Sequence, residues 1–224
     1  TITGGSSGDT IDAGSGDDVI TGGGGADTLI GGAGADTFVF ASGDVVSGES
    51  VNSDSSDTIE LSAGADISDV DAEGSGAGSA FNADSLTLSG DADVTMTVAQ
   101  HEGFSSITAA GNETVTLSDA GTVSGEAAVE TYVLGSGTNT FTLGSGGQSV
   151  DATADGNDTI DVQGLTATGQ FSTVTSDTIE LSNGADISDV DNSGGTTGGE
   201  LNADNLTLSG DADVTMTVAQ HEGF

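Results

Sequence analysis

The 224-residue sequence contains no lysine, arginine, cysteine, proline or tryptophan. Its 37 Asp and Glu side chains therefore face no basic ones, and the formal net charge is -37. A chain with so much charge of one sign repels itself unless positive charge comes from outside. The same sign excludes nucleic acid and anionic membrane surfaces as partners. Divalent cations remain, and carboxylate-rich sites favour the hard ions Ca²⁺ and Mg²⁺.

Other absences narrow the class of protein further. Without cysteine no disulfide can compensate for a thin core, which leaves a bound metal as the stabilising device. No apolar run reaches the roughly 18 residues that a membrane-spanning helix needs, and no basic segment precedes an apolar one as in a cleaved signal. An acidic disordered chain is the alternative. The 33% hydrophobic content is regularly spaced, which favours a folded chain when calcium is present.

Nine-residue repeats open the sequence. From Gly4 it divides into GGSSGDTID, AGSGDDVIT, GGGGADTLI and GGAGADTFV, which follow the pattern G-G-x-G-x-D-x-U-x with a large apolar U. This pattern resembles the RTX, or haemolysin-type, calcium-binding nonapeptide repeat family. The resemblance implies an all-β, right-handed parallel β-solenoid (a β-roll), with two short strands in each turn of about 18–20 residues. The aspartates at the sixth position are Asp9, Asp18, Asp27 and Asp36, and the apolar residues are Ile11, Ile20, Leu29 and Phe38.

Each part of the nonapeptide has a physical task. Glycine permits positive φ and close backbone approach, the aspartate adds a carboxylate, and Ca²⁺ requires about six to eight oxygen ligands. The family resemblance places the ions between stacked turns, so that Asp9 and Asp27 share one edge of the solenoid and Asp18 and Asp36 the other. The glycines expected to complete these sites are Gly14, Gly16, Gly22, Gly23, Gly25, Gly31, Gly32 and Gly34.

A polar residue followed two places later by an apolar one recurs beyond Phe40, which predicts a continuing solenoid. Two such positions carry amides in place of carboxylates, Asn139 and Gln148, so calcium sites should become sparser along the chain. Further calcium ligands are expected where the glycine frame is incomplete, at Asp66, Asp93, Asp158, Asp186 and Asp213. In residues 105–175 we expect Val115, Val133, Phe141, Val150 and Ile160 inside, with Thr114, Thr140 and Thr159 facing outward.

A longer repeat overlies the nonapeptides. The segment from Ser56 recurs from Ser176, and the segment Leu86–Phe104 recurs unchanged from Leu206, an offset of 120 residues in both cases. We therefore predict a calcium-binding β-roll at 1–40, an irregular boundary at 41–55, a first long repeat at 56–175 and a partial second copy at 176–224. The copies differ at 72–81 against 192–201, where we expect a loop. The chain is expected to be a slice of a tandem array.

No catalytic constellation is visible. A zinc or catalytic role for the repeated pairs His101-Glu102 and His221-Glu222 would need more converging ligands, and a turn or packing role is favoured. No serine has a nucleophile setting of the G-x-S-x-G type. Patterns such as Thr140-Phe-Thr142 could stack into a threonine ladder of the kind found in ice-binding solenoids, but threonine is also simply a good strand residue.

The leading functional hypothesis is a calcium-stabilised structural segment of a bacterial surface-layer, adhesin or matrix-filament protein. The alternatives are the calcium-folding secretion module of an RTX enzyme and an ice- or glycan-binding solenoid. Expected partners are calcium ions and copies of the same chain, joined head-to-tail in a fibre or lattice. The expected location is extracellular or at the cell surface, after export by a type I-like route without a cleaved signal.

Overall fold

The computed structural model describes residues 1–40, 50–53, 56–72, 80–81, 85–173, 177–190, 205–222 and 224. Most of the predicted boundary at 41–55 and of the predicted loops at 72–81 and 192–201 lies outside these residues. The chain is an all-β parallel β-solenoid of about eight turns of about 19 residues, with almost no helix. The predicted fold class is confirmed. It divides within strand β12 (Thr114–Leu117) into two compact units, Thr1–Val115 and Thr116–Phe224.

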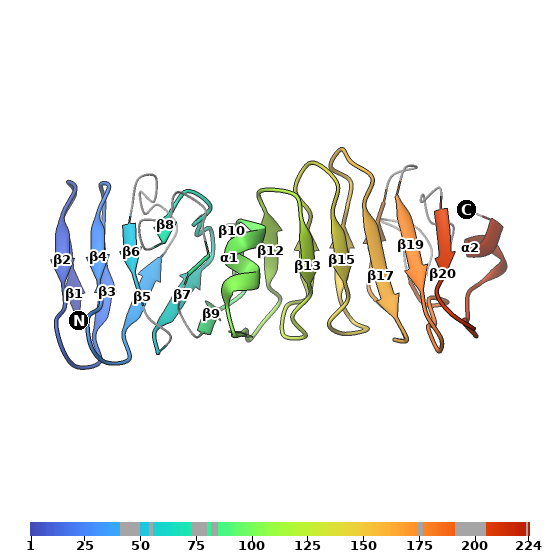
Figure 1. Cartoon of the computed structure of the whole chain (residues 1–224), viewed down its shortest axis with the longest axis horizontal. Coiled ribbons are helices and arrows are strands. Elements are labelled where there is room, and N and C mark those ends of the chain that lie inside the picture. Colours follow the sequence, from blue (N-terminus) through green and yellow to red (C-terminus); the bar gives the residue numbers. More distant parts are fainter. Residues whose placement is uncertain are drawn as a thin grey trace. The chain divides into compact units, whose positions relative to one another are not determined.

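The first unit contains two parallel sheets whose strands alternate along the chain (Figure 1). One sheet has the order β1 (Ile2–Thr3), β3 (Val19–Thr21), β5 (Thr37–Phe40), β7 (Thr58–Ser62), β9 (Ser85–Ser89) and β11 (Ser106–Thr108). The other has the order β2 (Thr10–Asp12), β4 (Thr28–Ile30), β6 (Ser50–Asn52) and β8 (Asp71–Ala72). Strand β10 (Asp93–Met96) and helix α1 (Val98–Gly103) complete this unit.

The second unit repeats this arrangement. One parallel sheet has the order β13 (Thr122–Ser124), β15 (Thr140–Thr142), β17 (Thr159–Gln163), β19 (Thr178–Leu181) and β20 (Asn205–Leu208). The other includes β14 (Thr131–Val133), β16 (Ser149–Asp151) and β18 (Phe171–Ser172), and helix α2 (Val218–Glu222) follows β20.

Strand register measures the length of each turn. Ile2 pairs with Ile20 and Ile11 with Leu29, so a turn of the nonapeptide segment takes 18 residues, as its two repeats predict. In the second unit Thr140 pairs with Thr159, a turn of 19 residues. Thr58 pairs with Ser85, a longer step of 27 residues that carries an insertion. The nonapeptide spacing is therefore kept where the glycine pattern is intact and relaxes where it is lost.

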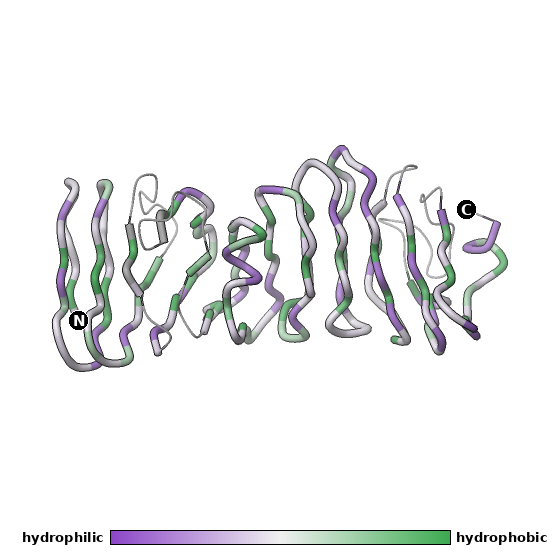
Figure 2. Tube along the Cα trace, viewed as in Figure 1, coloured by the Kyte–Doolittle hydropathy of each residue, from purple (hydrophilic) through white to green (hydrophobic). Residues whose placement is uncertain are grey.

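The core is a column of apolar side chains that alternate with outward polar ones along each short strand. Ile20, Leu29 and Phe38 are fully buried, and Figure 2 shows hydrophobic segments on strands throughout both units. Val115, Phe141, Val150 and Ile160 are buried as predicted. The predicted core residue Val133 is wrong: the fully buried side chain of β14 is Tyr132, and Val133 is half-buried. Adjacent strand residues face opposite sides, so an error of one position reverses the side chain.

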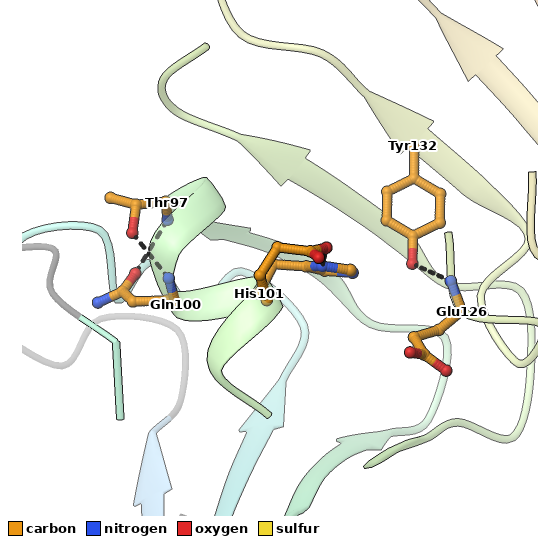
Figure 3. Close-up of polar contacts among 6 residues, drawn as sticks. Thr97, Gln100, His101, Glu126 and Tyr132 are labelled. Carbon is orange, nitrogen blue, oxygen red and sulfur yellow. Dashed lines mark hydrogen bonds and ion pairs between the residues drawn. The ribbon is translucent and has the colours of Figure 1, made fainter. Parts of the chain in front are cut away.

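Thr140 is exposed, while Thr114 and Thr159 are half-buried outside the core column. Helix α1 was not predicted, although its sequence carries a capping signal. The Thr97 side chain accepts a hydrogen bond from the Gln100 N–H (3.1 Å) and Gln100 Oε1 accepts one from the Thr97 N–H (2.9 Å), a reciprocal capping box (Figure 3). The buried Gln100 also donates from Nε2 to the Ile67 carbonyl at 2.7 Å. In the second copy Gln220 donates to the Ile187 carbonyl in the same way.

Candidate calcium-binding turns

Aspartates of successive turns are stacked through one carboxylate oxygen each. The Asp9 N–H donates to Asp27 Oδ1 and the Asp18 N–H to Asp36 Oδ1, both at 2.8 Å. The Asp36 N–H in turn donates to Asp57 Oδ1 at 2.9 Å. The sequence-predicted pairs Asp9–Asp27 and Asp18–Asp36 are therefore brought together one turn apart. Each carboxylate satisfies a backbone donor of the preceding turn.

The second carboxylate oxygen has no such partner at the two central positions. Asp27 and Asp36 are each only 1% exposed, and the buried Oδ2 atom of each accepts no hydrogen bond. A buried ionised carboxylate is strongly unfavourable unless it is paired with positive charge or coordinates a metal. The sequence has no lysine or arginine to supply that charge. A bound cation fits this requirement.

The turn glycines let the backbones of stacked turns approach more closely than any side chain would permit. Gly32 has φ +102°, and a Cβ at this position would lie 2.1 Å from the Gly14 carbonyl oxygen. A Cβ on Gly31 would lie 2.4 Å from Asp36 Oδ2. The space beside the unpartnered carboxylate oxygen is therefore lined by backbone, and backbone carbonyl oxygens are ordinary calcium ligands.

Side chains alone do not make a metal site. Within the described ranges, no three His, Cys, Asp or Glu side chains gather closely enough to hold an ion. Ca²⁺ takes about six to eight oxygens, so most ligands in these turns would have to be backbone carbonyls. That requirement agrees with the glycine-rich, tightly stacked turns, where Gly14 and Gly16 carbonyls face the turn above. The residues present fit calcium held by aspartate and main-chain oxygens together.

The five expected ligands with incomplete glycine frames divide into two groups. Asp66 and Asp186 are engaged locally, because Oδ1 of each accepts hydrogen bonds from the N–H and the hydroxyl of the serine two residues later. The Ser188 hydroxyl and N–H lower the pKa of Asp186. Asp93 and Asp213 are exposed. Only Asp158 joins a buried aspartate stack, and it is 1% exposed.

Sequence reasoning missed two members of the stacks. Asp57 and Asp177 are 1% and 0% exposed, and each accepts the backbone N–H of the stacked residue before it. Both stand two residues before a buried isoleucine, the same spacing as in the nonapeptides. That spacing is a sequence signal for a stack position even where the flanking glycines are missing.

In the second unit the stack runs through Asn139, Asp158 and Asp177. The Asn139 N–H donates to Asp158 Oδ1 (2.8 Å), and the Asp158 N–H donates to Asp177 Oδ1 (3.0 Å). Burial raises the pKa of Asp158, and the nearby Asp177 charge adds to this effect, while hydrogen bonds from Asn139 oppose it. Asp158 Oδ2 is buried and accepts no hydrogen bond.

The histidines show no catalytic arrangement. His101 is buried, with Nδ1 3.0 Å from Glu102 Oε1, and it lies on helix α1 (Figure 3). His221, its equivalent in the second copy, is exposed. The described part of the chain contains no pocket.

Comparison with known proteins identifies the N-terminal repeats. The family model described as the RTX calcium-binding nonapeptide repeat matches residues 3–38 in four copies. No curated protein and no solved structure gives a significant match. The matched region contains the stacked pairs Asp9–Asp27 and Asp18–Asp36.

Proposed function

We propose that this chain, whose residues 3–38 are RTX calcium-binding nonapeptide repeats, is a calcium-stabilised structural segment of an extracellular protein. The observation that carries the proposal is the pair of buried, unpartnered Oδ2 atoms on Asp27 and Asp36 in a chain without lysine or arginine. Calcium between the stacked turns neutralises these carboxylates. The nonapeptide segment then folds where calcium is abundant, as it is outside the cell.

The role as a structural array is supported by the duplication. Residues 86–104 recur as 206–224 without change, and repeat arrays supply length and stiffness through contacts between neighbouring turns. A surface layer, an adhesin stalk or a matrix filament needs these properties. The pocket-free surface of the described residues favours this role over catalysis. None of the described helices is long and apolar enough to cross a bilayer.

Calcium titration of the 224-residue chain tests the proposal. Far-ultraviolet circular dichroism should gain strand signal as Ca²⁺ is added, and calorimetry should detect bound ions that are lost in Asp27→Ala. The exposed Asp12 provides the control, because Asp12→Ala removes the same charge away from the stack. A strand spectrum that excess chelator leaves unchanged would contradict the proposal.

A second candidate function rests on the outer face of the second unit. Thr122, Thr140, Thr159 and Thr178 are paired in register across β13, β15, β17 and β19. Parallel strands lie about 4.8 Å apart, so the four residues form a regular ladder. Such a face suits a ligand with its own regular spacing, namely ice or an extended glycan. The neighbouring row is less uniform, with Ser124, Thr142, Asp161 and Glu180.

Thermal hysteresis and glycan binding test this second candidate directly. Thr159→Asp places a charge in the middle of the ladder and should abolish either activity without unfolding the chain. Wild-type protein that shows neither activity in saturating calcium would remove this candidate and leave the first one intact.

A further inference from the structure

Asn139 occupies the stack position that aspartate holds in the nonapeptides. It stands four residues after Gly135 and two after Gly137, just as Asp36 follows Gly32 and Gly34. Its Oδ1 accepts the N–H of Gly121, 18 residues earlier, at 3.0 Å. The oxygen of the amide therefore does what Oδ1 of a stacked aspartate does.

The amide nitrogen faces oxygen atoms. Asn139 Nδ2 donates to the Gly135 carbonyl at 2.8 Å and to Asp158 Oδ1 at 3.0 Å, and the Gly137 carbonyl lies at 3.4 Å. Asn139 is 1% exposed, so these contacts are shielded from water. Two main-chain oxygens and one carboxylate oxygen thus surround one nitrogen.

An aspartate in the same place would put an oxygen where this nitrogen is. That situation exists in the first unit, where Oδ2 of Asp27 and of Asp36 is buried and accepts no hydrogen bond. An ionised carboxylate has no hydrogen to donate, so a cation is needed between it and the surrounding oxygens. An amide has two N–H donors and needs none.

Gln148 makes an equivalent set of contacts at another turn. Its Nε2 donates to the carbonyls of Glu126 (2.8 Å) and Val129 (3.0 Å). Its Oε1 accepts the N–H groups of Gly144 (2.7 Å) and Ser145 (3.1 Å). This buried side chain closes its turn by hydrogen bonds alone.

We propose that the side-chain amides of Asn139 and Gln148 replace calcium in the second unit, so that calcium controls the order of the nonapeptide segment only. The chain then combines a calcium-responsive segment with a unit that keeps its fold at any calcium concentration. The statement about the nonapeptide segment rests on the calcium sites proposed above, whereas the statement about the second unit has its own readout.

The readout is Tyr132, the single tyrosine in a chain without tryptophan. Its side chain is fully buried, its ring centroid lies 4.7 Å from that of Phe141, and its hydroxyl accepts the Glu126 N–H at 2.9 Å (Figure 3). Tyrosine fluorescence and its near-ultraviolet circular dichroism therefore report on the second unit, while far-ultraviolet circular dichroism reports on both.

The experiment compares wild-type chain with Asn139→Asp in calcium and in excess chelator. In wild type, chelation should reduce the far-ultraviolet signal and leave the Tyr132 signal unchanged. In Asn139→Asp the Tyr132 signal should be lost in chelator and restored by calcium. The control is Asn157→Asp, which adds the same charge at an exposed position of a neighbouring turn and should behave as wild type.

Loss of the wild-type Tyr132 signal in chelator would overturn the inference, as would an Asn139→Asp signal that survives chelation. A far-ultraviolet signal that ignores chelation would instead overturn the proposed calcium sites, so the two failures are distinguishable. If Asn139→Asp does not fold even with calcium, amide hydrogen exchange of wild-type residues 135–160 decides. Equal protection with calcium and with chelator supports the inference, and lost protection overturns it.

Discussion

Changing Asp36 to asparagine should exchange dependence on calcium for dependence on a hydrogen bond. Oδ1 of Asp36 accepts the Asp18 N–H at 2.8 Å, and its buried Oδ2 accepts no hydrogen bond. Asparagine keeps the acceptor and replaces Oδ2 by a donor, as Asn139 does in the second unit. Alanine at the same position removes both atoms.

The magnitudes predict a reversal of order. In chelator, the unsatisfied carboxylate oxygen of wild-type Asp36 costs about 1–3 kcal/mol, so Asp36→Asn should be more stable than wild type by that amount. In calcium at about 100 times its dissociation constant, ion binding contributes about 2.7 kcal/mol to wild type, which should then be the more stable. Asp36→Ala loses the charged hydrogen bond as well, and in calcium it should lie about 4–6 kcal/mol below wild type.

Hydrogen exchange measured by mass spectrometry on residues 28–40 of the full chain gives these local opening free energies. Asp12→Asn, which removes an exposed charge from β2, is the control for the overall change in charge. If wild type exceeds Asp36→Asn by the same margin with calcium and with chelator, Oδ2 does not contact an ion and the assignment of this site is wrong.

Three further predictions concern packing, backbone and charge. In saturating calcium, thermal unfolding should show Phe141→Asp destabilised by several kcal/mol and Thr140→Asp by about 0.5 kcal/mol or less, because only the former charge is buried; equal melting would contradict the assigned register. Gly14→Ala should cost about 1–2 kcal/mol from its positive φ alone, whereas Gly32→Ala also meets a carbonyl oxygen and should raise the calcium midpoint further in a titration. Because burial raises the pKa of Asp158 above its ordinary 3.8, unfolding free energy should fall as pH rises through that window, and Asp158→Asn should flatten this slope in urea titrations with chelator; an unchanged slope would count against the burial of this charge.

The sequence was informative wherever a single period governs the chain. The nonapeptide spacing identified the buried column Ile20, Leu29 and Phe38 and the stacked pair Asp18–Asp36, because glycine, aspartate and apolar positions all repeat together. At β14 the pattern offers two adjacent apolar residues, Tyr132 and Val133, and only the pairing with β16 determines which one faces inward.

The candidate ligands outside the nonapeptides were harder to judge from sequence. Asp66 has a glycine two residues before it, as the nonapeptide aspartates do, yet its carboxylate is bound to the serine two residues later. Asp57 lacks the flanking glycines and is nevertheless a buried stack member. Local composition describes the turn, whereas stack membership depends on which residue lies one turn away, and insertions change that distance.

The contact that anchors helix α1 has a consequence for how such a chain can grow. Gln100 reaches the Ile67 carbonyl and Gln220 reaches the Ile187 carbonyl, and in both cases the partner lies 33 residues earlier. Each helix is thus fastened within its own copy of the 120-residue sequence. A gene that gains or loses whole copies encodes every fastening intact, so recombination can change the length of the array without requiring compensating mutations.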